Sequence, residues 1–131
     1  MVERVLIALI LVLAGACAFG LLKGHQMHRA SRATVATGKP TIVYFRNDAC
    51  VPCVTQARYV QQLEAQFGDR IVVEKLDAGA DQPTAERYGV FTVPTVLVVN
   101  PNGVVRYANY GLTDAGKLAA QLRSVQPQLA S

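Results

Sequence analysis

Residues 41–54 read TIVYFRNDACVPCV, a β-branched and aromatic run followed by two cysteines that two residues separate. A short apolar run of this composition is typical of a buried strand. Beyond the cysteines, apolar residues recur at spacings of three and four from Val54 to Phe67, which indicates an amphipathic helix ending at Gly68. The stretch therefore predicts a strand that leads directly into a helix, with Cys50 at the junction.

The rest of the chain continues this alternation of strands and helices. Downstream we expect, in chain order, a strand over Ile71–Leu76, a short helix from Asp81 to Tyr88, strands over Thr95–Val99 and Val104–Tyr107, and a terminal helix from Thr113. A turn signal at Asn100–Gly103 makes the last two strands a hairpin. The pattern predicts an α/β fold with a mixed central sheet of about four strands flanked by helices. The first two strands should be parallel, joined by a right-handed crossover.

The position of the cysteine pair favours reactive thiols. Cys50 falls at the carboxyl end of the first strand, the edge at which ligand chemistry gathers in α/β sheets. It also falls at a helix N-terminus, whose partial positive charge favours the thiolate. Cys53 follows one turn later on the same face, close enough to bond to Cys50. Pro52 suits a first helical turn because its missing N–H would be unpaired there anyway. The pair can thus cycle between dithiol and disulfide.

Two other roles for the pair remain open at this stage. A zinc site needs two further ligands, and the candidates are Cys17, His25 and His28, all on the N-terminal tail. These three residues could also bind copper, although a solvated linker explains the two histidines more simply. A purely structural disulfide that closes so short a loop would stabilise the fold little. We therefore assign no metal ligands to the pair.

An apolar segment precedes the α/β pattern. Val5–Leu22 is eighteen residues without a charge, at the short end for a membrane-spanning helix. Arg4, the apolar run and the small residues after it also suit a signal peptide. Four interpretations of the segment stay open: an uncleaved anchor, a cleaved signal, a lipidated Cys17 and a core helix. The predicted organisation is a signal anchor or signal peptide over 1–22, a basic juxtamembrane linker over 23–38 with a helical part over Met27–Thr37, and a folded domain over 39–131.

The distribution of charge bears on partners and location. The net charge of +4 divides into +3 for residues 1–38, with four Lys/Arg against Glu3, and +1 for the rest, with nine Lys/Arg against eight Asp/Glu. The domain has no basic stripe, so we expect no nucleic-acid partner. The positive-inside tendency alone would leave the domain in the cytoplasm. The signal-like features favour an extracytoplasmic domain, periplasmic or at the cell surface, either membrane-anchored or exported. A cytoplasmic-facing domain stays open.

The stretch from Thr41 to Gly111 resembles the thioredoxin family. The resemblance rests on TIVYF, CVPC, KLDAG and ERYGVFTVPTVLVVNPNGVVRYANYG. It implies a thioredoxin-like fold and thiol–disulfide oxidoreductase activity, without a bound cofactor. Cys50 would be the exposed nucleophile and Cys53 the buried resolving thiol.

The resemblance also implies residues around the pair. Pro94 would follow a cis peptide bond in a loop that binds the substrate backbone through Val93, and Gly111 would line the substrate groove. The reactivity of the pair would be tuned by Val51, Pro52 and Lys75.

Several positions depart from the family pattern. The chain has no tryptophan, and Ala49 stands where the family usually has one. Tyr44 replaces a buried aspartate that assists proton transfer at the resolving thiol. Arg58 replaces a helix-kinking proline, and Val51 replaces the usual glycine between the cysteines. These departures favour a membrane-tethered or exported relative of cytosolic thioredoxin.

Together these features predict a membrane-tethered reductase of protein disulfides. Its partners would be proteins with disulfides or thiols, the membrane through residues 5–22, and a membrane thiol transporter or another reductant. The alternatives are a disulfide-forming oxidant of the same fold, a non-catalytic thioredoxin-like binding module and a metal carrier.

Overall fold

The computed structural model describes the backbone of residues 1–30 and 36–131, and the side chains of residues 1–17 and 36–131. The chain divides into two units, Met1–Ala30 and Ser31–Ser131. The first unit is a single helix, α1 (Val2–Ala30). The second unit contains, in chain order, β1 (Thr41–Arg46), α2 (Val51–Phe67), η1 (Gly68–Arg70), β2 (Val72–Asp77), α3 (Gln82–Arg87), β3 (Thr95–Val99), β4 (Val105–Tyr110), α4 (Ala115–Val125) and η2 (Pro127–Ala130).

Helix α1 is longer than the apolar run that predicted it. It continues eight residues beyond Leu22, through the first half of the segment predicted as a linker. The helix expected over Met27–Thr37 begins inside α1, and residues 31–35 lie outside the described part of the chain. Within the residues that the structure describes, no helix has both the length and the apolar character needed to cross a membrane.

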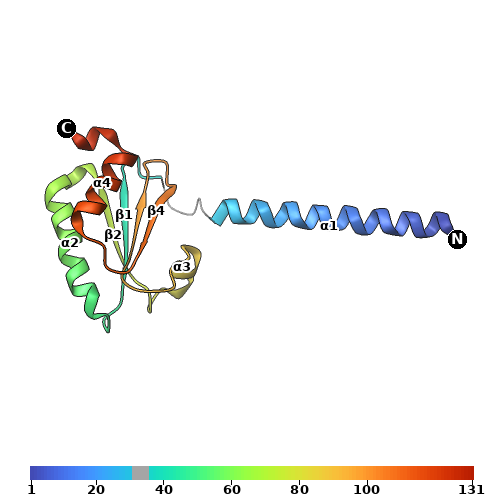
Figure 1. Cartoon of the computed structure of the whole chain (residues 1–131), viewed down its shortest axis with the longest axis horizontal. Helices are drawn as coiled ribbons and strands as arrows, with labels where there is room; N and C mark the ends of the chain where they lie inside the picture. The colour runs from blue at the N-terminus through green and yellow to red at the C-terminus, as the bar shows by residue number, and fades with distance from the viewer. Residues whose placement is uncertain (31–35) are drawn as a thin grey trace. The chain divides into compact units, whose positions relative to one another are not determined.

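The second unit is built on one mixed sheet with strand order β2-β1-β3-β4 (Figure 1). Strands β1 and β2 are parallel, as predicted for a strand–helix–strand crossover. Strand β3 runs antiparallel to both β1 and β4, and β3 and β4 form the predicted hairpin. This register places the start of β3 beside the end of β1, where the cysteine pair follows.

Helices cover both faces of the sheet. Helices α2 and α4 lie on one face and α3 lies on the other (Figure 1). Side chains alternate along β1, so Ile42 and Tyr44 join the core under α2 and α4, while Val43 and Phe45 join the core under α3. All four are buried, and this explains why β1 is a continuous apolar run instead of an alternating one.

The predicted elements are present, with shifted ends. Asp81 accepts a hydrogen bond from the N–H of Thr84 and caps α3. Hydrogen bonds from the side chain and from the backbone N–H of Thr84, with a smaller contribution from Arg87, lower the pKa of the Asp81 carboxyl. Gly68 ends α2 in a positive-φ conformation. The terminal helix starts at Ala115 with Asp114 as its cap, two residues after the predicted start. Strand β4 extends three residues beyond the predicted Tyr107.

Candidate active site: the Cys50–Cys53 pair

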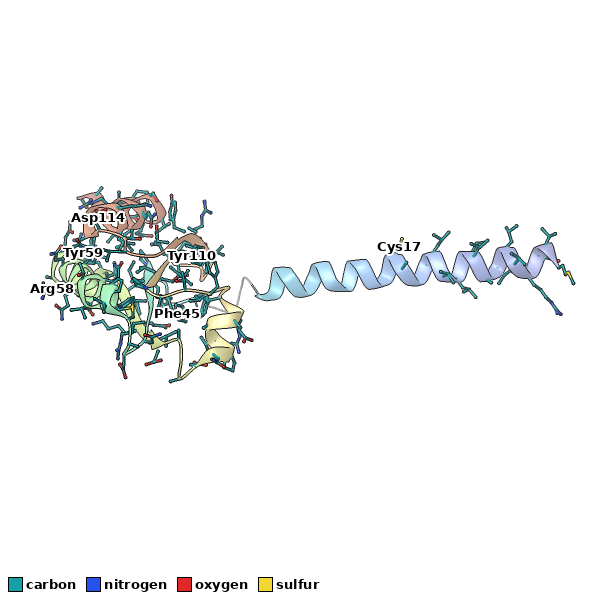
Figure 2. The ribbon with its side chains drawn as sticks, turned by 60° about the horizontal axis from the view of Figure 1, so that its bottom comes forward. Cys17, Phe45, Arg58, Tyr59, Tyr110 and Asp114 are labelled. Carbon is teal, nitrogen blue, oxygen red and sulfur yellow. A yellow bond between two sulfur atoms is a disulfide. The ribbon has the colours of Figure 1, made fainter. Side chains whose placement is uncertain are left out.

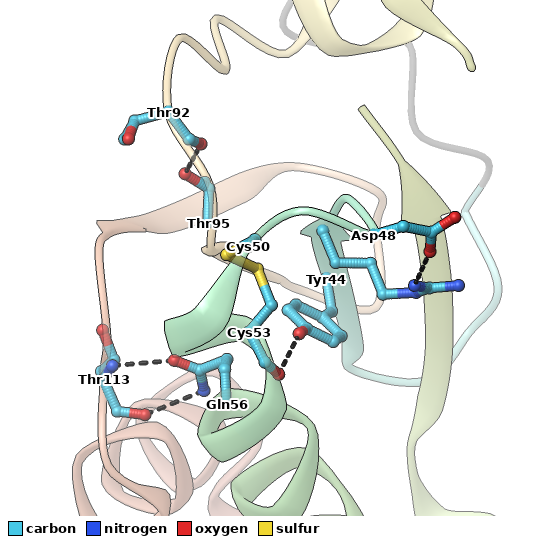
Figure 3. The surroundings of a disulfide bond; sticks show 9 residues. Tyr44, Asp48, Cys50, Cys53, Gln56, Thr92, Thr95 and Thr113 are labelled. Atoms are coloured by element: carbon cyan, nitrogen blue, oxygen red, sulfur yellow. Dashed lines mark hydrogen bonds and ion pairs between the residues drawn. A yellow bond between two sulfur atoms is a disulfide. The ribbon is translucent and has the colours of Figure 1, made fainter. Parts of the chain in front are cut away.

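The two cysteines lie at the N-terminus of α2 and form a disulfide in this structure (Figure 3). Cys50 is the N-cap residue, Cys53 is in the first turn, and their Cα atoms are 5.3 Å apart. Cys53 is only 4% exposed and packs in the core, whereas Cys50 is partly exposed. Pro52 lies in the first turn of α2, and Val51 between the cysteines is 81% exposed. The more accessible sulfur is thus the one at the helix N-terminus.

Tyr44 occupies the buried position under the pair. Its side chain points from β1 toward α2, and its hydroxyl donates a 2.8 Å hydrogen bond to the carbonyl oxygen of Cys53 (Figure 3). Burial raises the pKa of Tyr44, and the positive charge of Arg46 offsets part of that rise. The phenol therefore stays neutral at physiological pH. It supplies a hydrogen-bond donor where the thioredoxin pattern has an ionisable carboxyl group.

The predicted substrate-binding residues meet at the same edge of the sheet. The Val93–Pro94 peptide bond is cis, as the resemblance implies, and it comes directly before β3. Val93 and Cys50 pack against the same buried cluster. The N–H of Gly111 donates a 2.8 Å hydrogen bond to the carbonyl oxygen of Pro94, and Gly111 has a positive φ of 84°. The structure thus brings the cysteine pair and these three residues together; their roles in binding remain predictions.

Gln56 is a site residue that the sequence did not reveal. It lies three positions after Cys53 on the buried face of α2 and is completely buried. Its amide donates to the carbonyl oxygen of Thr113 at 2.9 Å and accepts from the N–H of Thr113 at 2.8 Å (Figure 3). The two bonds tie the active-site helix to the segment that follows Gly111. The signal in the sequence that could have identified Gln56 was a glutamine in the otherwise apolar buried face of α2.

The charged residues near the pair are exposed. Lys75, predicted to tune the pair, forms a 3.0 Å ion pair with Glu64 at the surface. Arg46 and Asp48 form a second exposed ion pair, also 3.0 Å long, in the segment before Cys50. Exposed pairs of this kind contribute little to stability.

The described side chains do not support a zinc or copper site. Among them, no group of three or more His, Cys, Asp or Glu residues is arranged to hold a metal ion. His25 and His28 lie outside the described side chains, and Cys17 is an exposed free cysteine on α1 (Figure 2).

The chain is similar in sequence and fold to known proteins. The Thioredoxin family model matches residues 26–124. The chain is 38% identical to Thioredoxin of Bacillus subtilis over 56 residues, which are 43% of this chain and 54% of that protein, so the match spans about half of that relative's length. It is 36% identical to Probable Thioredoxin of Methanothermobacter thermautotrophicus over 66 residues, which are 50% of this chain and 74% of that protein.

A solved structure of a mutant thioredoxin from Halobacterium salinarum superimposes with a TM-score of 0.63 at 26% identity, covering 72% of this chain and 80% of that one. A malarial thioredoxin-2 superimposes with a TM-score of 0.62 at 21% identity, covering 66% of this chain and 82% of that one, and supports the fold alone. Since the family model matches well over half of the chain, the chain belongs to the thioredoxin family.

Proposed function

We propose that this protein reduces disulfides in protein substrates through Cys50 and Cys53. The class of chemistry, thiol–disulfide exchange, follows from the family and from the pair. The reducing direction and the protein substrates are the proposal. One observation carries it: a partly exposed Cys50 at a helix N-terminus is bonded to a buried Cys53, beside the loop that contains Val93 and Pro94.

The reduced pair would act in two steps. The Cys50 thiolate attacks a substrate disulfide, forms a mixed disulfide and releases the first substrate sulfur as a thiolate. Cys53 then loses its proton and attacks the Cys50 sulfur, which releases the second substrate thiolate and closes the Cys50–Cys53 disulfide. Two electrons pass from the pair to the substrate, and an external dithiol must return them before the next turnover.

The position of each cysteine suits its step. The N-terminal end of α2 places partial positive charge at Cys50, which favours the thiolate that must attack. Cys53 is buried, so a substrate disulfide meets Cys50 first. Val93 and Gly111 would hold the substrate backbone, and Val51, Pro52 and Lys75 would tune the pair.

We propose further that residues 5–22 tether the domain to a membrane, with the domain on the extracytoplasmic side. Support comes from the sequence: eighteen residues without a charge follow Arg4. A reductase in that location would draw electrons from a membrane thiol transporter or a comparable dithiol donor. Alkaline carbonate washing of cell membranes tests the tether. The full chain is expected in the membrane pellet, and its release into the wash would contradict the tether.

The enzymatic proposal is tested by reduction of insulin by the full-length chain with dithiothreitol as electron donor. The wild-type protein is expected to accelerate the reaction, and Cys50→Ser is expected to abolish the acceleration. Cys17→Ser is the matched control, because Cys17 is a free cysteine on α1, outside the second unit. A Cys50→Ser variant as active as the wild-type protein would contradict the proposal.

A further inference from the structure

A second pocket adjoins the redox site on the α3 side of the sheet. Its volume is about 290 Å³, and its wall combines polar, aromatic and apolar side chains. We call it the α3 pocket, and its main lining residues are Asn47, Gln82, Glu86, Phe91, Thr92 and Val93. None of these residues has a role in the two-step reaction except Val93, which is predicted to hold the substrate backbone.

Two residues link the α3 pocket to the surroundings of the cysteine pair. Asn47 lines both this pocket and the pocket of about 360 Å³ that contains Cys50 and Cys53. Val93 lines the α3 pocket and packs against the same core cluster as Cys50. A substrate chain held at Val93 with its cysteine at Cys50 would therefore direct a nearby side chain toward the α3 pocket.

The polar groups of the α3 pocket favour a hydrogen-bond donor with a positive charge. Glu86 is the charged residue in the described lining, and its carboxylate has no ion pair or hydrogen bond within the described part of the chain. The side-chain oxygen of Asn47 is buried and has no hydrogen-bond partner among the described residues.

Neighbouring charges do not neutralise Glu86. The carboxylate of Asp77 accepts from the N–H groups of Gly79 and Ala80, and that of Asp81 caps α3. Arg87, the next residue to Glu86, acts on Asp81, and no lysine or arginine belongs to the described lining. The described lining of the α3 pocket therefore carries one negative charge and no positive one.

Phe91 adds an aromatic surface to this acidic pocket. Its ring is 79% exposed and stacks on Tyr110 with ring centroids 4.6 Å apart, which holds the ring in place without covering it. An aromatic ring beside a carboxylate suits a guanidinium group, which stacks on the ring and donates hydrogen bonds in its own plane. The remaining wall, including Ala85 and Val90, can pack against an aliphatic stem.

We propose that the α3 pocket binds a cationic side chain of the substrate, preferably arginine, within two residues of the target cysteine. This inference rests on the proposed function, since it names the substrate that the same site selects. Glu86 provides the charge and Phe91 the stacking surface.

Reduction of short peptide disulfides by the full-length chain tests this selection. The peptides have the same sequence except within two positions of the target cysteine. There, one peptide carries arginine, and the others carry lysine, norleucine or glutamate. We expect kcat/KM to be about three- to tenfold higher for arginine than for glutamate, the range of a partly exposed ion pair with a ring contact. Glu86→Gln should bring this ratio close to one, and Glu86→Lys should invert it.

Glu74→Lys is the matched control. It changes the net charge as Glu86→Lys does, and Glu74 is an exposed residue of β2 that does not line the α3 pocket. The arginine preference should survive in this variant. A wild-type ratio near one, a preference for norleucine over arginine, or an equal loss of preference in Glu74→Lys would overturn the inference.

A binding measurement separates this inference from the proposed function. Peptides with serine in place of cysteine cannot exchange disulfides, so NMR titration of the oxidised protein reports on the pocket alone. We expect saturable shifts of the amide signals of Glu86 and Phe91 with the arginine peptide and much smaller shifts with the glutamate peptide. Equal shifts with both peptides would contradict the pocket assignment. Selective binding without reduction of any peptide would instead contradict the reductase proposal.

Discussion

The hydroxyl of Tyr44 donates a 2.8 Å hydrogen bond to the carbonyl oxygen of Cys53, so strand β1 is tied directly to the second redox cysteine. Tyr44→Phe removes this bond and leaves the ring in place. A buried hydrogen bond contributes about 0.5–1.5 kcal/mol, and we expect the free energy of unfolding to fall by that amount at pH 7. Denaturant unfolding of the oxidised protein measures it. Tyr59→Phe on α2 is the control (Figure 2), and an equal loss in both variants would contradict the role of the bond.

The same phenol predicts a loss of stability in alkali. Burial raises the pKa of Tyr44 above its usual value of 10.0, so the unfolded chain loses this proton first as the pH rises. Unfolding is thereby favoured above that pH. The free energy of unfolding continues to fall with rising pH until the phenol of the folded protein also ionises. We expect the free energy of unfolding to decrease more steeply above pH 10 in the wild-type protein than in Tyr44→Phe. Parallel curves for the two proteins would show that the buried phenol is not responsible.

Gln56→Leu tests the tie between α2 and the segment after β4. The change leaves the N–H and the carbonyl oxygen of Thr113 without their partner, and Thr113 is only 6% exposed. Two unpaired buried groups, at about 1–3 kcal/mol each, lower the free energy of unfolding by about 2–6 kcal/mol. Gln62→Leu makes the same change on the exposed face of α2 and should have little effect. Similar unfolding midpoints for the two variants would contradict the importance of this tie.

Cys53→Ala tests the division of roles between the cysteines. Without the resolving thiol, the mixed disulfide on Cys50 cannot be released, so covalent complexes with substrate proteins should accumulate in cells. Non-reducing gels of the captured protein detect them, and Cys50→Ala is the control that should capture none. Complexes in the control variant, or none in Cys53→Ala while the wild-type protein is active, would show that the roles are assigned wrongly.

The sequence predicted much of the fold, for physical reasons visible in particular residues. Strand β1 could be recognised because both of its faces are buried, which requires an uninterrupted apolar run such as Ile42–Phe45. The junction at Cys50 followed from the helical spacing that begins immediately after it. These signals are local, so neighbouring residues alone were sufficient to identify them.

Features that depend on distant partners could not be predicted. Strand β4 was expected to end at Tyr107, before the polar residue Asn109. In the structure Asn109 is buried and pairs with Gln121 of α4 and with the carbonyl oxygen of Val96. The burial of Gln56 is likewise explained only by its hydrogen bonds to Thr113, which lies 57 positions away in the sequence. Each of these polar residues is buried because a tertiary partner satisfies it, and the sequence does not name that partner.

The reduction potential of the Cys50–Cys53 pair distinguishes a reductase from a disulfide-forming oxidant. It is measured on the full-length chain, purified in detergent micelles and equilibrated in defined thiol buffers, with Cys17→Ser to exclude the third thiol. We expect a value of about −270 mV, that of thioredoxin and suited to a reductase. A value of about −120 mV, that of a strong disulfide-forming oxidant, would contradict the reducing direction. A pair that does not cycle at all would contradict the redox function itself.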